Sequence, residues 1–339
     1  MQVQRLGLCA GVFFACALAV TLASPEARAA DQYVMKITLP TLNDAPHQYA
    51  KNLAARIEKD TGGRIKGEIY PASQLGSIPR QIEGVQFGSI QCIVVPPEFM
   101  VGIDPRFQLM AAPGLVESMP QAQRVASDPA VLKLMLSLGK GKGLHGEGLF
   151  PVLPSAIVSR VPIRHLADFK GKKIRIFASD FQSTAFSRLG ATPVAMSLGD
   201  VLPAIQQGTI DGAIAGMPVF TAFQYQDAAK YVTGTGQPYI FIIAEISEKW
   251  RAGLPPDLRE IVDRDTAEVS KSMYDFSTKI WAQSQSDWVA KGGERIELPA
   301  DEQAAMMETL GSVAQDVASK NPTLAAAYQI VADAAKRDK

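Results

Sequence analysis

Short apolar runs alternate with amphipathic segments along most of the chain. The segments at 46–59 and 77–87 carry apolar residues at helical spacing, and Asp44 can cap the first of them. Strand-like runs rich in apolar and β-branched residues lie at 33–39, 65–70 and 90–95. Strand and helix in this alternation predict a parallel sheet of the α/β class. Loops at the carboxyl ends of its strands should face a crevice.

A second unit of the same kind follows. Helices are predicted at 181–189 and 198–207. Strands are predicted at 152–158, 173–177, 192–196, 210–215 and 239–244. The last of these can carry the chain back to the first unit.

One helical pattern covers residues 255–292, which is longer than either unit needs. Such a helix would reach about 50 Å and could cross both units. Two more helices are predicted near 301–319 and 323–336. We therefore expect two lobes, each a mostly parallel sheet flanked by helices. The expected bounds are lobe I at 30–151 with about 241–280 returning to it, lobe II at 152–240 with about 281–339 returning to it, and a bridging helix at 255–292.

The first 29 residues have a different pattern. Arg5 precedes an uncharged apolar stretch at 6–23, and Ala27-Arg28-Ala29 places small residues at a signal-peptidase site. The stretch could be a membrane anchor, but the helix-breaking Ser24-Pro25 follows it at once. We expect residues 1–29 to be a cleaved signal peptide and the protein to be periplasmic.

Composition excludes several classes of partner. The chain has 34 basic and 34 acidic residues. Without Arg5, Arg28 and Glu26 the counts become 32 and 33, a net charge of −1. This balance argues against nucleic acid and against a polybasic membrane surface. Only Cys92 remains after cleavage, so no intramolecular disulfide can form. We expect it to be a buried structural thiol.

The sequence contains few residue patterns that are typical of enzymes. The three histidines are scattered, with no His-x-x-x-His or Cys/His cluster for a metal. A Gly-x-Ser-x-Gly elbow and a Gly-x-x-x-x-Gly-Lys phosphate loop are also missing. We therefore expect no enzyme, metal or cofactor. His47 falls in the first turn of a helix at the crevice, where it can contact a ligand or merely solvent.

The most informative residue is Arg175. It alternates with Ile174 and Ile176 on a predicted strand, so it should project from the opposite face or from the strand end. A guanidinium is planar and permanently charged, and it can grip a carboxylate through two parallel hydrogen bonds. The pattern alone leaves a surface ion pair between strands equally open.

Several segments, in this order and spacing, resemble the substrate-binding subunits of TRAP-type (tripartite ATP-independent periplasmic) transporters. They are Gln74-Leu-Gly76, Asp168-Phe-Lys-Gly-Lys-Lys-Ile-Arg175, Leu189-Gly-Ala-Thr-Pro193 and Gln206-Gln-Gly-Thr-Ile-Asp-Gly212. The resemblance implies a two-lobed periplasmic binding protein fold braced by one long helix. It also implies that Arg175 holds the ligand carboxylate. The partners it implies are a small and a large integral membrane subunit of the transporter.

Departures from the family pattern bear on the ligand. Ala213-Ile-Ala215-Gly216 stands where many members have a Gln-Glu-Asn-Pro-like run, and Gln91 replaces an acid. Leu198 stands where an aromatic residue is frequent, and Ser155 aligns near a second arginine. Buried polar ligand groups without partners cost about 1–3 kcal/mol each. The pocket therefore suggests a monocarboxylate with an apolar body.

The candidate ligand-binding residues share a predicted place at the crevice. Apolar and aromatic residues at such places belong to the core at least as often. The candidates are Arg175, Phe177, Leu198, Ala215, Met217, Phe220, Tyr239, His47, Pro96 and Ser155.

Three functions remain open at this point. A transport binding protein should bind a ligand tightly without turnover, with opening and closing of its lobes. A ligand sensor would use the same closed form to dock on a receptor. A periplasmic enzyme would need a nucleophile, metal or acid–base pair. The first is favoured, and the protein is expected to be a monomer.

Overall fold

The computed structural model describes residues 32–337, so the signal peptide expected at 1–29 lies outside the described residues. Within residues 32–337 no helix is both long and apolar enough to cross a lipid bilayer.

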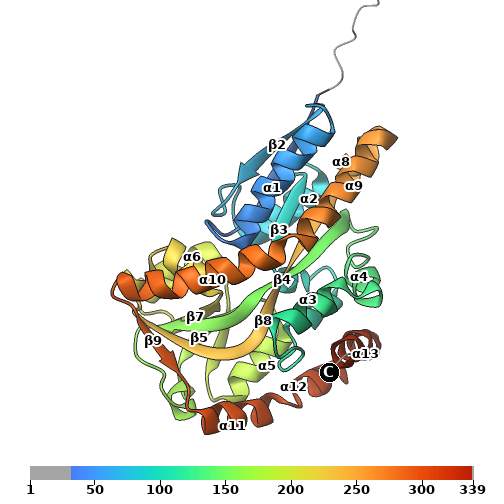
Figure 1. The fold of residues 1–339 in the computed structure, drawn as a ribbon. Coiled ribbons are helices and arrows are strands. Elements are labelled where there is room, and N and C mark those ends of the chain that lie inside the picture. Colours follow the sequence, from blue (N-terminus) through green and yellow to red (C-terminus); the bar gives the residue numbers. More distant parts are fainter. Residues whose placement is uncertain (1–31, 338–339) are drawn as a thin grey trace, which may run out of the picture. The chain divides into compact units, whose positions relative to one another are not determined.

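The first parallel group of strands is built as the alternating pattern predicts (Figure 1). Strand β1 (Tyr33–Thr38) pairs in parallel with β2 (Ile65–Tyr70) and with β3 (Cys92–Val95). Helices α1 (Ala45–Asp60) and α2 (Ile78–Phe87) make the two connections. Asp44 caps α1 by accepting a hydrogen bond from the backbone N–H of His47, as the sequence indicates.

A second parallel group repeats this construction. Strand β5 (Lys173–Ile176) pairs in parallel with β6 (Thr192–Ala195) and with β7 (Gly212–Ala215). Helices α5 (Asp180–Arg188) and α6 (Leu198–Gln206) connect the strands, and α7 (Met217–Ala222) follows the last of them.

Two long antiparallel strands, β4 (Leu144–Ser159) and β8 (Tyr231–Ser247), join the two groups into one sheet. The strand order is β2-β1-β3-β8-β4-β7-β5-β6, and β9 (Glu294–Glu297) pairs with β8. The strands predicted at 152–158 and 239–244 are therefore much too short. Glycine and proline residues interrupt their apolar pattern, but β-bulges after Gly146, Pro151 and Pro154 absorb them without ending the pairing.

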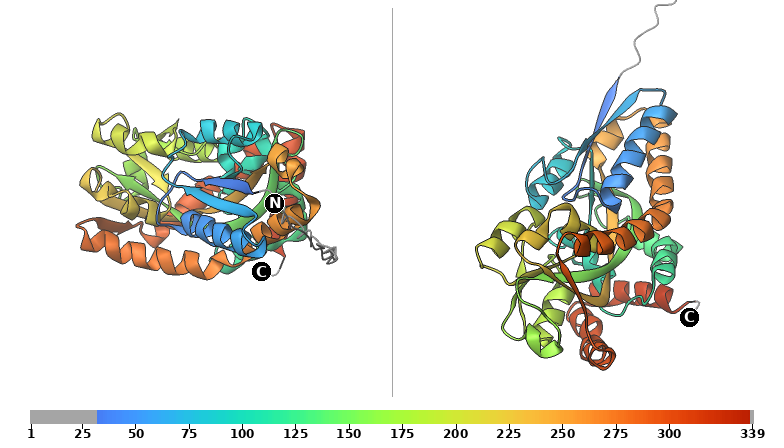
Figure 2. Two further views of the ribbon diagram at one scale, coloured as in Figure 1. Left: turned by 90° about the horizontal axis from the view of Figure 1, so that it is seen from above. Right: turned by 60° about the vertical axis from the view of Figure 1, so that its left-hand side comes forward.

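The pattern at 255–292 is a helix with one interruption. It forms α9 (Pro256–Lys271) and α10 (Met273–Ala290), which meet at Ser272. Ser272 keeps a helical backbone conformation, while its hydroxyl donates to the carbonyl of Val269 and competes with the helical hydrogen bonds. Both helices pack on β4, with α9 against α1 and α10 against α7 (Figures 1 and 2). The pair thus contacts both parallel groups.

The C-terminal segment forms three helices where two were predicted. The expected helix at 301–319 is divided at Gly311-Ser312 into α11 (Ala300–Leu310) and α12 (Val313–Ala318). Helix α13 (Pro322–Lys336) follows. It packs against α3 (Met119–Ser127) and α4 (Pro129–Met135). Because the C-terminal segment also contacts α5, it touches residues on both sides of position 151, and the predicted lobe bounds stay a prediction.

The remaining elements are short. They are α8 (Glu248–Gly253) and the 3₁₀ helices η1 (Pro97–Met100), η2 (Pro105–Ala111), η3 (Leu166–Phe169) and η4 (Tyr225–Asp227).

Apolar side chains fill both sides of the sheet. Tyr49 of α1 and Leu258 of α9 share one core with Cys92 of β3, and Trp288 of α10 belongs to a core beside β7. Cys92 is fully buried, and this burial raises the pKa of its thiol far above the usual range. The prediction of a buried structural thiol is confirmed.

Candidate functional site

A cavity lies where the two parallel groups meet. Its walls come from the carboxyl ends of β1, β3, β5 and β7, from the middle of β4 and β8, and from α10. Its empty space is about 690 Å³ when the part open to solvent is counted. The position at the carboxyl ends of parallel strands is the predicted crevice.

Arg175 of β5 lines this cavity, and its side chain is only 1% exposed. Its Nε donates to the carbonyl of Met196 at 2.9 Å, and its Nη1 donates to the carbonyl of Ile214 at 3.0 Å. Among the described residues, Nη2 makes no hydrogen bond. The backbone thus holds the guanidinium in one orientation and leaves its outer end without a partner.

Two aromatic rings cover the guanidinium. The Cζ atom of Arg175 lies 4.9 Å from the ring centroid of Phe177 and 5.8 Å from that of Phe99. The two rings also contact each other, with centroids 5.3 Å apart. Cation–π attraction of this kind is strongest where water is excluded.

The charge of Arg175 is not balanced within the described residues, where no carboxylate forms an ion pair with it. Burial lowers the pKa of the guanidinium to about 10, while Tyr225 acts in the opposite direction. The side chain remains positively charged at neutral pH. A surface ion pair between strands is therefore excluded, because the residue is buried and lacks an acidic partner.

The cavity lining holds three other polar side chains: Thr41, Asp44 and Ser277. Burial raises the pKa of Asp44 to about 7, although hydrogen bonding with Thr41 and the backbone N–H of His47 acts to lower it. The hydroxyl oxygens of Thr41 and Ser277 are buried and lack a well-formed hydrogen bond. The rest of the lining is apolar or glycine.

Five of the predicted site residues line this cavity together. They are Pro96, Arg175, Phe177, Leu198 and Ala215. Their common feature is a place at or just beyond the end of a strand, except for Leu198, which begins α6. Their contact with a ligand stays a prediction.

Three other candidates make hydrogen bonds away from the cavity lining. The Nδ1 atom of His47 accepts from the backbone N–H of Asn43 at 3.0 Å, within the turn before α1. Ser155 donates its hydroxyl to the carbonyl of Gln237 at 3.1 Å. The hydroxyl of Tyr239 lies 3.4 Å from the carbonyl of Glu117.

The last two candidates, Met217 and Phe220 of α7, pack into the core. Met217 is 2% exposed and Phe220 is 1% exposed. The ring of Phe220 contacts Tyr225 and Trp288, with centroids 5.5 Å and 6.4 Å away. Their immediate neighbours Gly216, Pro218 and Val219 line the cavity instead. The turn into α7 decides this, because it points successive side chains in different directions.

Among the lining residues that escaped prediction, four have polar or aromatic side chains. Asp44 was assigned only its capping role, which fully accounts for an aspartate at that position. Ser277 lies between Met273 and Ile280 on the apolar face of the long helix, and a polar residue on such a face is a signal. Thr41 and Phe99 lie in connections whose path the apolar pattern does not specify.

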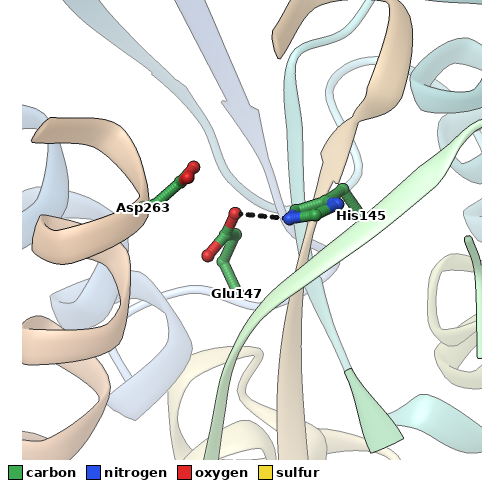
Figure 3. A group of neighbouring side chains, drawn as sticks. All are labelled: His145, Glu147 and Asp263. Carbon is green, nitrogen blue, oxygen red and sulfur yellow. Dashed lines mark ion pairs between the residues drawn. The ribbon is translucent and has the colours of Figure 1, made fainter. Parts of the chain in front are cut away.

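A second group of polar side chains lies away from the cavity. His145 and Glu147 of β4 meet Asp263 of α9, with ligand atoms within 4.8 Å of one another (Figure 3). The Nε2 atom of His145 lies 3.0 Å from Glu147. The local sequence gave no metal pattern, because these residues come from distant segments. Arg251 contacts both Glu147 and Asp263, so these residues and His145 form an ion-pair network.

Known proteins match both the sequence and the fold. The C4-dicarboxylate-binding periplasmic protein DctP of Rhodobacter capsulatus is 25% identical over 90% of this chain and 92% of its own length. The 2,3-diketo-L-gulonate-binding periplasmic protein YiaO of Escherichia coli is 25% identical over 82% of this chain and 84% of its own.

A solved structure has the same fold. It is a TRAP periplasmic solute-binding protein from Desulfovibrio salexigens with bound orotic acid, with a TM-score of 0.82 and 22% identity. The match covers 90% of this chain and all of that one.

The family model for bacterial extracellular solute-binding proteins of family 7, named DctP, matches residues 38–321. This span includes every strand of the sheet except β1, of which it covers only Thr38. It is a family of solute-binding proteins, not of enzymes. The chain belongs to family 7 of the bacterial extracellular solute-binding proteins, the DctP family of TRAP transport, as its sequence motifs indicated.

Proposed function

We propose that this protein captures a small organic monocarboxylate in the periplasm and delivers it to a TRAP membrane transporter, with Arg175 as the carboxylate anchor. The observation that carries the proposal is a buried guanidinium at the cavity wall, for which the described part of the chain provides no acidic partner. A buried charge is costly unless it is paired. A ligand carboxylate supplies the missing partner.

The orientation of Arg175 favours two-point binding. Met196 and Ile214 each accept one hydrogen bond through their carbonyl oxygens, and this leaves N–H groups of Nη1 and Nη2 available. The two terminal nitrogens of a guanidinium match the two oxygens of a carboxylate. The ring of Phe177 limits the space beside them.

A monocarboxylate fits the rest of the lining better than a dicarboxylate. Arg175 is the only cationic side chain of the described lining, so a second carboxylate would find no positive partner there. Asp44 would repel it when ionised. The names of three relatives state their ligands, which are C4-dicarboxylates, 2,3-diketo-L-gulonate and orotic acid. The family therefore accepts organic acids of several shapes.

Isothermal titration against a panel of mono- and dicarboxylates tests this proposal. Arg175→Ala should weaken carboxylate binding by about 1.5–3 kcal/mol, or roughly 10- to 150-fold, because a charge-assisted pair in a desolvated site is lost. Arg175→Lys keeps the charge but loses the planar guanidinium with its parallel N–H donors, so it should recover only part of the affinity that Arg175→Ala loses. Normal binding by the alanine variant would contradict the anchor. Tighter binding of succinate or malate than of every monoacid would contradict the monocarboxylate preference.

Delivery to a small and a large membrane subunit is part of the same proposal. A ligand sensor that docks on a receptor is the alternative, and the site itself serves either role. Deleting the two membrane subunits should abolish uptake of the bound acid if the protein serves transport. Uptake that continues without them would favour sensing. We also propose that the protein acts as a monomer, which size-exclusion chromatography with light scattering will test.

A further inference from the structure

Two buried hydroxyl groups of the cavity lining make no well-formed hydrogen bond within residues 32–337. They belong to Thr41, just beyond β1, which interacts with the carboxyl of Asp44, and to Ser277 of α10, which is fully buried. Leaving a buried polar group unpaired costs about 1–3 kcal/mol, and folded proteins rarely do so without a reason. Both residues line the cavity that the proposed ligand would fill.

The arrangement of α1 and the long helix brings these hydroxyls to one end of the cavity. Arg56 of α1 pairs with Asp265 of α9, and Asn52, one turn earlier, contacts Met273 of α10. The two helices therefore run in opposite directions. The start of α1, where Asp44 caps the helix, comes next to the turn of α10 that carries Ser277.

Arg175 belongs to a different part of the fold. It comes from β5 in the second parallel group, whereas Thr41 and Asp44 follow β1 in the first. The cavity thus has a cationic wall and a separate hydroxyl and carboxyl wall, with apolar side chains over the rest of its lining.

Resting on the carboxylate-binding function above, we propose that the ligand carries a hydroxyl group besides its carboxylate, and that Thr41, Asp44 and Ser277 bind this hydroxyl. The ligand class is therefore a hydroxylated monocarboxylate with an otherwise apolar body. The three residues determine specificity, while Arg175 supplies the common anchor.

A hydroxyl suits this wall better than the other polar groups of organic acids. It donates and accepts, so it can pair with either hydroxyl and with Asp44 in either protonation state. Both states of Asp44 are populated near neutral pH, because burial raises its pKa to about 7. An ammonium group would require the ionised carboxylate that burial disfavours. A second carboxylate would meet no cation.

Matched pairs of acids test the inference on the full chain. The pairs are 4-hydroxyphenylacetate with phenylacetate, and 6-hydroxyhexanoate with hexanoate, measured by isothermal titration. In at least one pair the hydroxylated acid should bind roughly 5- to 150-fold more tightly, the factor that corresponds to about 1–3 kcal/mol. Thr41→Val and Ser277→Ala should reduce this ratio towards one, because each removes a partner of the ligand hydroxyl.

Ser284→Ala provides the control for Ser277→Ala. Ser284 lies two turns further along α10 and is equally buried, but its hydroxyl donates to the carbonyl of Trp281 and it is not in the cavity lining. This variant should keep the hydroxyl preference of the wild type.

The stability of the ligand-free protein gives a second readout, which distinguishes ligand binding by the Ser277 hydroxyl from a structural role. Ser277→Ala removes a buried hydroxyl that makes no hydrogen bond within residues 32–337, so the melting temperature of the ligand-free protein should stay the same or rise. Ser284→Ala should lower it.

The outcomes separate this inference from the proposed function. Carboxylate binding that depends on Arg175 but shows no hydroxyl preference in either pair would overturn the inference alone. So would tighter binding of 6-aminohexanoate than of 6-hydroxyhexanoate. If none of these acids and no member of the wider carboxylate panel binds, the proposed function fails and the inference fails with it.

Discussion

At the scale of single residues, the cavity is defined by polar groups that the protein leaves incompletely paired. Among residues 32–337, Arg175 lacks an acidic partner, and the hydroxyls of Thr41 and Ser277 lack a well-formed hydrogen bond. Asp44 retains its capping bond, yet burial raises the pKa of its carboxyl to about 7. Each of these groups lowers the stability of the empty protein. Proteins keep such local costs mainly where a ligand removes them.

The raised pKa of Asp44 has a measurable effect on stability. Between its ordinary value of 3.8 and about 7 the folded protein holds a proton that the unfolded chain releases. This residue therefore makes the free energy of unfolding fall as the pH rises through that interval. Asp44→Asn keeps a capping oxygen and should flatten this part of the profile, as measured by urea unfolding from about pH 4 to pH 8.

Asp128 is a matched control, because it caps α4 in the same way. Burial acts to raise its pKa, but hydrogen bonds from Arg337, Val131 and Ala130 hold the pKa below the usual range. Its contribution is present above the unfolded pKa and is lost as the pH falls. Asp128→Asn should therefore cost stability near neutral pH and little in acid. An Asp44→Asn profile parallel to that of the wild type would show that Asp44 does not titrate as described.

The sequence predicts a cavity residue only where its type has no other structural reason at that position. Arg175 stands out because strand alternation takes it away from Ile174 and Ile176, and because its motif resembles a known family. Asp44 satisfies the rule for a helix cap, so its place in the cavity lining leaves no trace in the local pattern. Whether the hydroxyl of Ser277 finds a partner depends on neighbours from other segments, which only the folded structure brings to it.

At the scale of elements, the close approach of β4 to the long helix positions one wall of the cavity. Gly148 of β4 faces Ser270 of α9 and Tyr49 of α1. A Cβ atom at this glycine would lie 2.0 Å from the hydroxyl of Ser270 and 3.3 Å from that of Tyr49. The hydroxyl of Ser270 is itself bonded to the carbonyl of Thr266, which limits its freedom to move.

Gly148→Ala should therefore destabilise the protein by about 1–3 kcal/mol through overpacking. Urea unfolding monitored by circular dichroism measures the change. Gly199→Ala is the control, because a Cβ there meets nothing within 4 Å and the residue lies inside α6. It should be neutral or stabilise by up to about 1 kcal/mol. Equal stability of the Gly148 variant and the wild type would mean that β4 and α9 separate at little cost.

The same strand shows why element lengths are hard to predict. Gly146, Gly148 and Pro151 are residues that usually end a strand, and the predicted strand begins only after them, at 152. In the structure they fall at bulges, where the extra residue needs no partner. By contrast, α1 and α2 were placed well, because a helix signals its start and period locally.

At the scale of the whole molecule, one continuous sheet connects the two parallel groups. The two-lobed α/β architecture follows from the repeated strand–helix pattern. The continuity of the sheet cannot be predicted from that pattern, because β3 pairs with β8 between residues about 150 positions apart, such as Cys92 and Ile246. Local patterns contain no information on such a partner. The resemblance to a family implied crossing strands but not their register.

This continuity predicts a single unfolding transition for the ligand-free protein. Neither parallel group has a core that is independent of β4 and β8, since both strands contribute to each. In differential scanning calorimetry the measured enthalpy should match the van't Hoff enthalpy. Two resolved transitions, or an enthalpy ratio well above one, would show that the two groups unfold separately.

The burial of Cys92 has a practical consequence. In a chain that begins at Ala30 it is the only cysteine, and its thiol is fully buried and resists deprotonation. A cysteine introduced at an exposed position, such as Phe87→Cys on α2, would then be the sole reactive thiol. A dye or a solid support can be attached there without replacing Cys92. The protein is thus ready to be made into an optical sensor or an affinity resin for the acid it captures.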